Sequence, residues 1–148
     1  MTWRGRPEYE LLEHTADAGV LVRAATLEEL FEKAAAAMYD LIADVDAVAH
    51  DLYRGAIVDE IRVEGLDTET LLVAWLGELL SLGMVGGILF GAFEVQTLSE
   101  TALVARAWGK TLDARVHRFR TELKAVTYHD LWVRREGGEW VAHVIFDV

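Results

Sequence analysis

Large apolar side chains recur at helical spacing in a segment near residue 75. Of all the features of the sequence, this segment limits the possible folds most strongly. Its spacing of three and four residues predicts an α-helix, which Asp67 and Glu69 would open with acids near the positive end of the helix dipole. The apolar face is broader than that of a surface helix, so we expect this helix to be well buried. Its apolar positions are Leu71, Leu72, Trp75, Leu76, Leu79 and Leu80.

A second helical pattern follows residues 26–29, Thr-Leu-Glu-Glu. These four residues form a capping box, in which the Thr26 hydroxyl accepts from first-turn amides and Glu29 reaches back. Apolar residues at helical spacing then extend the predicted helix to about residues 40–43. Asp44 lies just past this end, where the helix dipole disfavours a carboxylate. We therefore expect a positive group close to Asp44.

The remaining sequence is rich in strand patterns and places most of them after the second helix. Gly137-Gly138 predicts a two-residue hairpin turn, because glycine adopts positive φ without steric cost. The order predicts an α+β fold, a mostly antiparallel β-sheet sandwich covered by two α-helices. A single domain over residues 1–148 is expected, since this length buries one core. Strands are predicted at 8–13, 18–24, 57–63, 88–95, 103–108, 121–128, 131–134 and 140–146, with connectors at 45–54, 83–87 and 109–119.

Composition and charge limit the classes of function. The formal charge of −11 argues against strong direct binding to nucleic acid, which depends on lysine and arginine. A basic cluster at Arg115, His117, Arg118 and Arg120 is best interpreted as a solvated charged turn. The chain has no cysteine, no signal-peptide pattern and no apolar run near the ~18 residues of a membrane span. We therefore expect a cytoplasmic protein without membrane contact, of undetermined oligomeric state.

Three aspartates are the candidates for chemistry. Asp17 lies between two predicted strands, Asp44 follows the first helix, and Asp147 ends the last strand beside the α-carboxylate of Val148. Two bare carboxylates at ~4 Å repel by about 4 kcal/mol at an effective dielectric near 20, so a cluster needs protons or a cation. Oxygen ligands alone favour Ca²⁺ or Mg²⁺. Nothing in the spacing brings the three together, and from these residues alone ordinary surface acids are favoured.

Two motifs give the chain a specific resemblance. Residues 9–17 are Tyr-Glu-Leu-Leu-Glu-His-Thr-Ala-Asp, and residues 124–129 are Lys-Ala-Val-Thr-Tyr-His. With residues 26–31, 71–80 and 144–148, they occur in the order found in the archease family, which the sequence resembles over nearly its whole length. The match is weaker at residues 81–87, Ser-Leu-Gly-Met-Val-Gly-Gly, where the family usually continues with aromatic and acidic residues.

The resemblance implies an accessory protein and not an enzyme. Archeases activate the GTP-dependent RNA ligase of tRNA splicing and RNA repair, which joins a 3′-phosphate or cyclic phosphate end to a 5′-hydroxyl. They promote guanylylation of the ligase and multiple turnover. The family binds a divalent cation, most often Ca²⁺, with Mg²⁺ or Mn²⁺ as alternatives. Carried over, the metal ligands are Asp17, Asp44, Asp147 and Val148, and residues for partner contact or site support are Lys124, His129 and His14.

Two other functions remain open at this point. A general chaperone, or a modulator of RNA-modifying enzymes, would bind clients through an apolar patch and would not depend on Asp17. A metal-dependent hydrolase would use the same carboxylates, with His14 or His129 as general base. The sequence has no glycine-rich phosphate loop, no G-x-S-x-G and no H-E-x-x-H.

Overall fold

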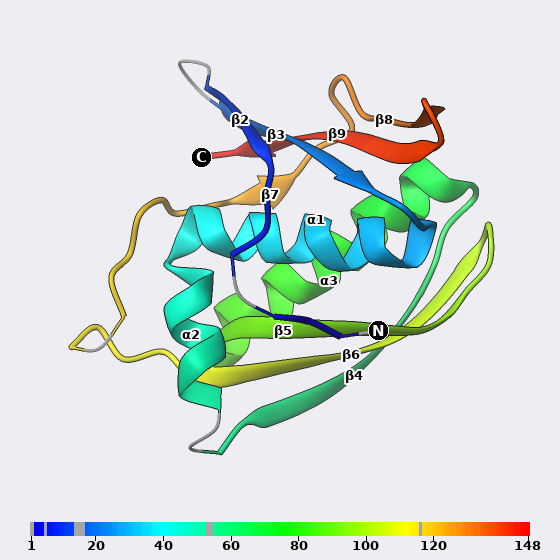
Figure 1. Ribbon diagram of the computed structural model, residues 1–148. Coiled ribbons are helices and arrows are strands. Elements are labelled where there is room, and N and C mark those ends of the chain that lie inside the picture. The colour runs from blue at the N-terminus through cyan, green and yellow to red at the C-terminus, as the bar shows by residue number, and fades with distance from the viewer. Residues whose placement is uncertain (1, 5, 14–16, 53–54, 116) are drawn as a thin grey trace.

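The structure is a computed structural model that describes residues 2–4, 6–13, 17–52, 55–115 and 117–148. This part of the chain is built from two antiparallel sheets and three helices (Figure 1). The first sheet has the strand order β1-β5-β6-β4: β1 (Thr2–Arg4), β5 (Ile88–Leu98), β6 (Ala102–Thr111) and β4 (Ile57–Glu64). The second has the order β2-β3-β9-β7, with β8 also paired to β9: β2 (Glu10–Glu13), β3 (Asp17–Ala24), β9 (Glu139–Asp147), β7 (Ala125–Val126) and β8 (Trp132–Glu136). The predicted α+β class is confirmed.

The two long helices, α1 (Leu27–Ile42) and α3 (Thr68–Gly86), lie between the sheets (Figure 1). α1 contacts β1 and β5 on one side and β3 and β9 on the other, while α3 contacts β4, β5 and β6 on one side and β7 and β8 on the other. Trp75 of α3 is fully buried, and its indole N–H donates to the Phe31 carbonyl of α1 at 2.9 Å. The prediction that this helix is buried is confirmed, because a sheet covers each of its broad apolar sides.

By length and composition alone, α3 could cross a membrane. Its central side chains, however, are buried against the two sheets and α1. The core helix of a folded domain can meet the same length and composition criteria as a membrane span. The buried apolar side chains of the sheets and helices form one continuous cluster.

A third helix, α2 (Val45–Asp51), occupies part of the stretch predicted as a connector, so the prediction for residues 45–54 is wrong there. Asp44 is its N-cap: one carboxylate oxygen accepts from the backbone N–H groups of Asp46 at 3.1 Å and Ala47 at 3.3 Å. Aspartate is a preferred N-cap because it satisfies amides that lack a partner within the helix. Asp44 therefore belongs to the start of α2 as well as to the end of α1. The Thr26 half of the predicted capping box is confirmed, with Thr26 Oγ1 accepting from Glu29 N–H at 3.2 Å, whereas the Glu29 side chain pairs with Lys33 at 3.6 Å.

The predicted flexible link at residues 83–87 is instead mostly the last turn of α3. Gly83 lies against the hydroxyl of Tyr39, where a Cβ would collide, so close packing of α1 on α3 requires glycine there. Gly87 ends the helix at φ 63°, the left-handed conformation that glycine adopts most readily. Gly83 thus serves the packing of two helices, and Gly87 serves as the C-cap of α3.

The C-terminal half confirms the predicted hairpin and shortens one strand. Gly137 and Gly138 both have positive φ and join β8 to β9, with Glu136 opposite Glu139. The strand predicted at 121–128 is wrong over most of its length, because only β7 pairs there. Upstream, the Arg120 N–H donates to the Ile42 carbonyl at 2.8 Å and Phe119 bridges to Ala43, which directs the chain to the end of α1 and away from β9.

Candidate functional site

Asp17 and Asp147 lie directly opposite each other in the β3–β9 pair. Directly opposite residues of an antiparallel pair point to the same face of the sheet with their Cβ atoms about 5 Å apart, and like charges placed this way destabilise the sheet. The Oδ1 atom of Asp17 is buried and has no hydrogen-bond partner among the described residues. The pair therefore places two like charges and one unsatisfied carboxylate oxygen at the same end of the sheet.

The end of β9 is held from both sides. β3 pairs on one edge, and on the other β7 places Ala125 opposite Asp147, while the Lys124 N–H donates to the Asp147 carbonyl at 2.8 Å. Val148 follows immediately and is exposed. The backbone thus fixes Asp147 beside Asp17 and leaves Val148 exposed.

Asp44 is committed to other contacts. Besides capping α2, its carboxylate lies 3.7 Å from the Arg6 guanidinium and 4.0 Å from that of Arg120. The expected positive group near Asp44 is therefore present, and it consists of the protein's own arginines. The ends of α1 and β9 lie on the same side of the molecule in Figure 1.

A buried acid next to this position, Asp40, was not singled out from the sequence. Its side chain accepts from the Tyr9 hydroxyl at 2.8 Å and the Val45 N–H at 3.3 Å, and it forms an ion pair with Arg120 at 3.2 Å. Burial and the bond to Asp40 raise the pKa of Tyr9, so Tyr9 is the donor. The cluster joins the N-terminal segment, both helix ends and the loop before β7. It therefore positions the backbone that carries Asp44.

The described residues contain no group of three or more His, Asp or Glu side chains that could hold a metal ion. The structure thus brings Asp17 and Asp147 together but does not add Asp44 to them as a preformed ligand set. Val148 adjoins the pair in sequence. The metal site of Asp17, Asp44, Asp147 and Val148 stays a prediction.

The expected partner-contact residues lie at separate places. Lys124 is exposed at the start of β7. His129 is exposed beyond the other end of β7, with Nε2 3.4 Å from the Asp130 carboxylate. His14 lies outside the described residues. Of the two that the structure describes, Lys124 is the one whose backbone bonds to Asp147 of the pair described above.

The predicted basic cluster is mostly neutralised. Arg115 pairs with Asp113 at 3.2 Å, and Arg120 with Asp40. His117 is buried, and its Nδ1 accepts from the Asp113 N–H at 3.2 Å. Its Nε2 atom is buried without a partner among the described residues. Only Arg118 of the four is an exposed cation for which no ion pair is seen among the described residues.

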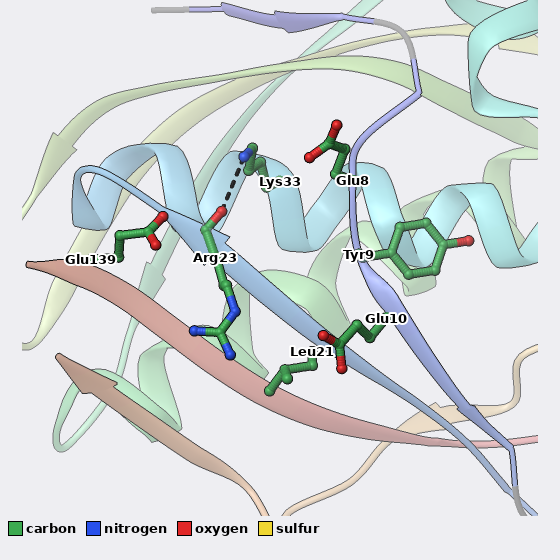
Figure 2. A pocket seen from close by; sticks show the side chains of 7 residues that line it. All are labelled: Glu8, Tyr9, Glu10, Leu21, Arg23, Lys33 and Glu139. Carbon is green, nitrogen blue, oxygen red and sulfur yellow. Dashed lines mark hydrogen bonds between the residues drawn. The ribbon is translucent and has the colours of Figure 1, made fainter. Parts of the chain in front are cut away.

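A mixed-charge pocket of about 300 Å³ lies between the N-terminal segment, β3 and α1 (Figure 2). Its two cations are engaged within the protein: Lys33 donates to the Arg23 carbonyl at 3.0 Å, and Arg23 lies 3.7 Å from Glu136. Figure 2 shows the Tyr9 ring pointing away from both. None of the residues predicted for a site lines this pocket.

The residues present at the β3–β9 end fit a hard divalent cation. Their donors are all oxygens, the like charges oppose each other, and one buried carboxylate oxygen is unsatisfied. Asp17, Asp147 and the α-carboxylate of Val148 would hold such an ion. Asp44 would join them only after giving up its contacts with Arg6 and Arg120.

The fold is that of solved archease-type structures. The solution structure of Protein 1598 from Methanobacterium thermoautotrophicum matches with a TM-score of 0.75 and 32% identity, covering 95% of this chain and 98% of that one. An archease from Thermotoga maritima, described as a possible chaperone, matches with a TM-score of 0.60 at 21% identity, covering 93% and 94%. The latter likeness concerns the fold alone.

The chain belongs to the archease family. The model of the Archease protein family matches residues 9–148. Protein archease of Methanopyrus kandleri is 43% identical over 143 residues, covering 95% of this chain and 99% of its own length. That of Methanosarcina mazei is 39% identical over 145 residues, covering 95% and 96%.

Proposed function

We propose that this protein is an accessory factor, without catalytic activity of its own, that activates a GTP-dependent RNA ligase in the cytoplasm. It would promote guanylylation of the ligase and allow repeated joining of 3′-phosphate ends to 5′-hydroxyl ends. Family membership supports the general role. The observation that carries the mechanism is the opposed pair Asp17 and Asp147, with its buried unsatisfied oxygen.

The divalent ion, Ca²⁺ or alternatively Mg²⁺ or Mn²⁺, would neutralise these opposed carboxylates when bound. The protein's own residues would hold it at an exposed chain end, where a ligase can reach it. Lys124 would support the site through its backbone bond to Asp147. Such an arrangement suits either delivery of a metal to the ligase or stabilisation of its guanylylation-competent conformation.

Replacing Asp17 with asparagine is expected to lower stimulation of ligation by at least roughly 10-fold, because it removes a charged ligand oxygen without changing side-chain size, and loss of even an outer-shell partner typically costs that much. The measurement is multiple-turnover ligation of a 3′-phosphate RNA by the host's ligase with GTP and divalent metal. Asp59→Asn, in β4 of the other sheet, is the matched control and should stimulate like the unmodified protein. Full stimulation by folded Asp17→Asn protein would refute the metal mechanism. Absence of stimulation by the unmodified protein would refute the proposed function.

A C-terminal tag is expected to weaken divalent binding relative to an N-terminal tag. The tag converts the Val148 carboxylate to an amide and crowds the end of β9, whereas β1 belongs to the other sheet. Calorimetric titration of both tagged proteins with Ca²⁺ measures the difference. Equal affinities would show that the chain terminus is not part of the site.

A chaperone-like modulator of RNA-modifying enzymes is the second candidate. The exposed apolar side chains at the end of α3 and before β7 favour it, since a broad client range requires apolar surface. This function predicts suppression of aggregation of unrelated proteins by Asp17→Asn and unmodified protein alike. Ligase-specific stimulation that depends on Asp17 would exclude it.

A further inference from the structure

Two adjoining hollows of about 370 and 380 Å³ lie along the end of α3 and the segment that leads into β7. They adjoin at Leu80 and Met84, which line both, and the two hollows together are named here the α3 groove. Met84 is 59% exposed, and across the groove Phe119 is 47% exposed. The neighbouring Val85 is 88% exposed. Large apolar side chains gathered this way mark an interaction surface.

The charges along the α3 groove indicate what kind of surface would cover it. Residues 113–124 contain four arginines and lysines and two acids, in a chain whose formal charge is −11. Lys124 lines one hollow as its only charged side chain. In the other, Arg120 is already paired with Asp40, and Glu122 is exposed. Among the described residues no ion pair is seen for Lys124, so an acidic group on the occupant would complement this cation.

The α3 groove also adjoins the Asp17–Asp147 pair. Lys124 forms part of its wall, and the backbone N–H of the same residue bonds to Asp147. Ala125, in the same wall, lies opposite Asp147 in the β7–β9 pair. A protein seated in the groove would therefore reach the end of β9 without any rearrangement of the fold. Continuity of groove and carboxylates favours the same partner for both.

We propose that the α3 groove docks the RNA ligase through a segment that carries two large apolar side chains and an acidic residue opposite Lys124. This inference rests on the proposed function and adds its contact surface. Met84 and Phe119 would receive the apolar anchors, since buried apolar contacts at the centre of an interface carry most of its energy. Lys124 would set the orientation and increase the rate of association.

Met84→Asp and Phe119→Asp test the apolar contacts, measured as affinity for the ligase by calorimetry and as ligation against the concentration of this protein. Each is expected to raise the dissociation constant roughly tenfold or more. Saturating Met84→Asp protein should restore full stimulation, whereas saturating Asp17→Asn should not. Leu66→Asp is the matched control, because Leu66 is 89% exposed and does not line the groove. Its affinity should be unchanged.

Two charge-reversing substitutions, which change the charge of the groove in opposite directions, test whether the segment bound in it is acidic. Lys124→Glu should weaken binding, and Glu122→Lys should leave it equal or tighter. Both residues are exposed, so the fold should tolerate either change. Weaker binding by Glu122→Lys and tighter binding by Lys124→Glu would show a basic occupant and overturn the proposal.

Three results distinguish failure of the docking proposal from failure of the proposed function. Stimulation by the unmodified protein, with unchanged affinity of Met84→Asp and Phe119→Asp, would overturn the docking proposal and leave the proposed function standing. No stimulation by the unmodified protein would overturn both. A dimer in sedimentation experiments that Met84→Asp dissociates, with ligase binding unaffected, would show that the α3 groove joins two copies of this chain.

Discussion

Replacing Glu32 with glutamine is expected to stabilise the protein at pH 8 by up to roughly 3 kcal/mol, because one pKa unit corresponds to about 1.4 kcal/mol. Glu32 lies in α1 and is 1% exposed. Its Oε2 accepts from the Val95 N–H at 2.9 Å, next to an irregularity in the β5–β6 pairing, while its Oε1 has no partner among the described residues. Burial raises the pKa of Glu32 to about 7, although the Val95 bond opposes the shift.

The direction of the pH dependence follows from proton binding. Between pH 4.5 and about 7 the folded state binds more protons at Glu32 than the unfolded state does, so the free energy of unfolding falls as pH rises. A neutral glutamine keeps an acceptor for Val95 and removes this loss. Chemical denaturation at pH 5 and pH 8 measures it: the unmodified protein should lose stability across this interval by more than Glu32→Gln does.

Glu28→Gln is the control, since Glu28 lies in the same helix and is exposed. Its effect should stay within about 0.5 kcal/mol at either pH, as for most surface changes. Because many other acids titrate in this chain, only the difference between the two variants reports on Glu32. Equal pH dependence in both would show that the buried carboxyl is not coupled to folding.

The long elements were predictable because their patterns are local. The apolar spacing around Trp75 identified a buried helix, and Gly137-Gly138 identified a hairpin. β1 escaped prediction because three residues carry too short a pattern. The buried acids Glu32 and Asp40 escaped because α1 lies between two sheets, where side chains off the main apolar face are buried too.

The candidate site depends on pairing between distant parts of the chain. The sequence placed Asp17 at a strand boundary and Asp147 at a strand end, but only the β3–β9 register sets them opposite each other. Asp44 was interpreted as a misplaced acid because the short helix after it was not recognised. Val45, Val48 and Ala49 at helical spacing were the signal for α2, with Asp44 as its N-cap.

Replacing Arg120 with methionine is expected to destabilise the protein by about 1 to 2 kcal/mol, because the buried Asp40 carboxylate loses its ion-pair partner, while the Arg120 side chain is 41% exposed and screened by solvent. Asp40 is 3% exposed and, among the described residues, would keep Tyr9 and the Val45 N–H as its hydrogen-bond donors. The Arg120 guanidinium also donates to the Asp40 carbonyl at 3.0 Å, so the end of α1 would lose a second bond. Chemical denaturation at pH 7 measures the change.

A double-mutant cycle distinguishes this charge effect from lost packing. Asp40→Asn combined with Arg120→Met should be more stable than Arg120→Met alone, because the uncompensated charge is gone. Arg115→Met is the control: its pair with Asp113 is exposed and should contribute less than about 1 kcal/mol. Additive effects of the two changes would mean that Arg120 acts through packing and through its bond to the Asp40 carbonyl, and not through the Asp40 charge. Strong coupling would instead show that the Asp40–Arg120 ion pair joins the end of α1 to the segment that lines the α3 groove. The same pair would then position the start of α2 and the Asp44 carboxylate relative to that segment.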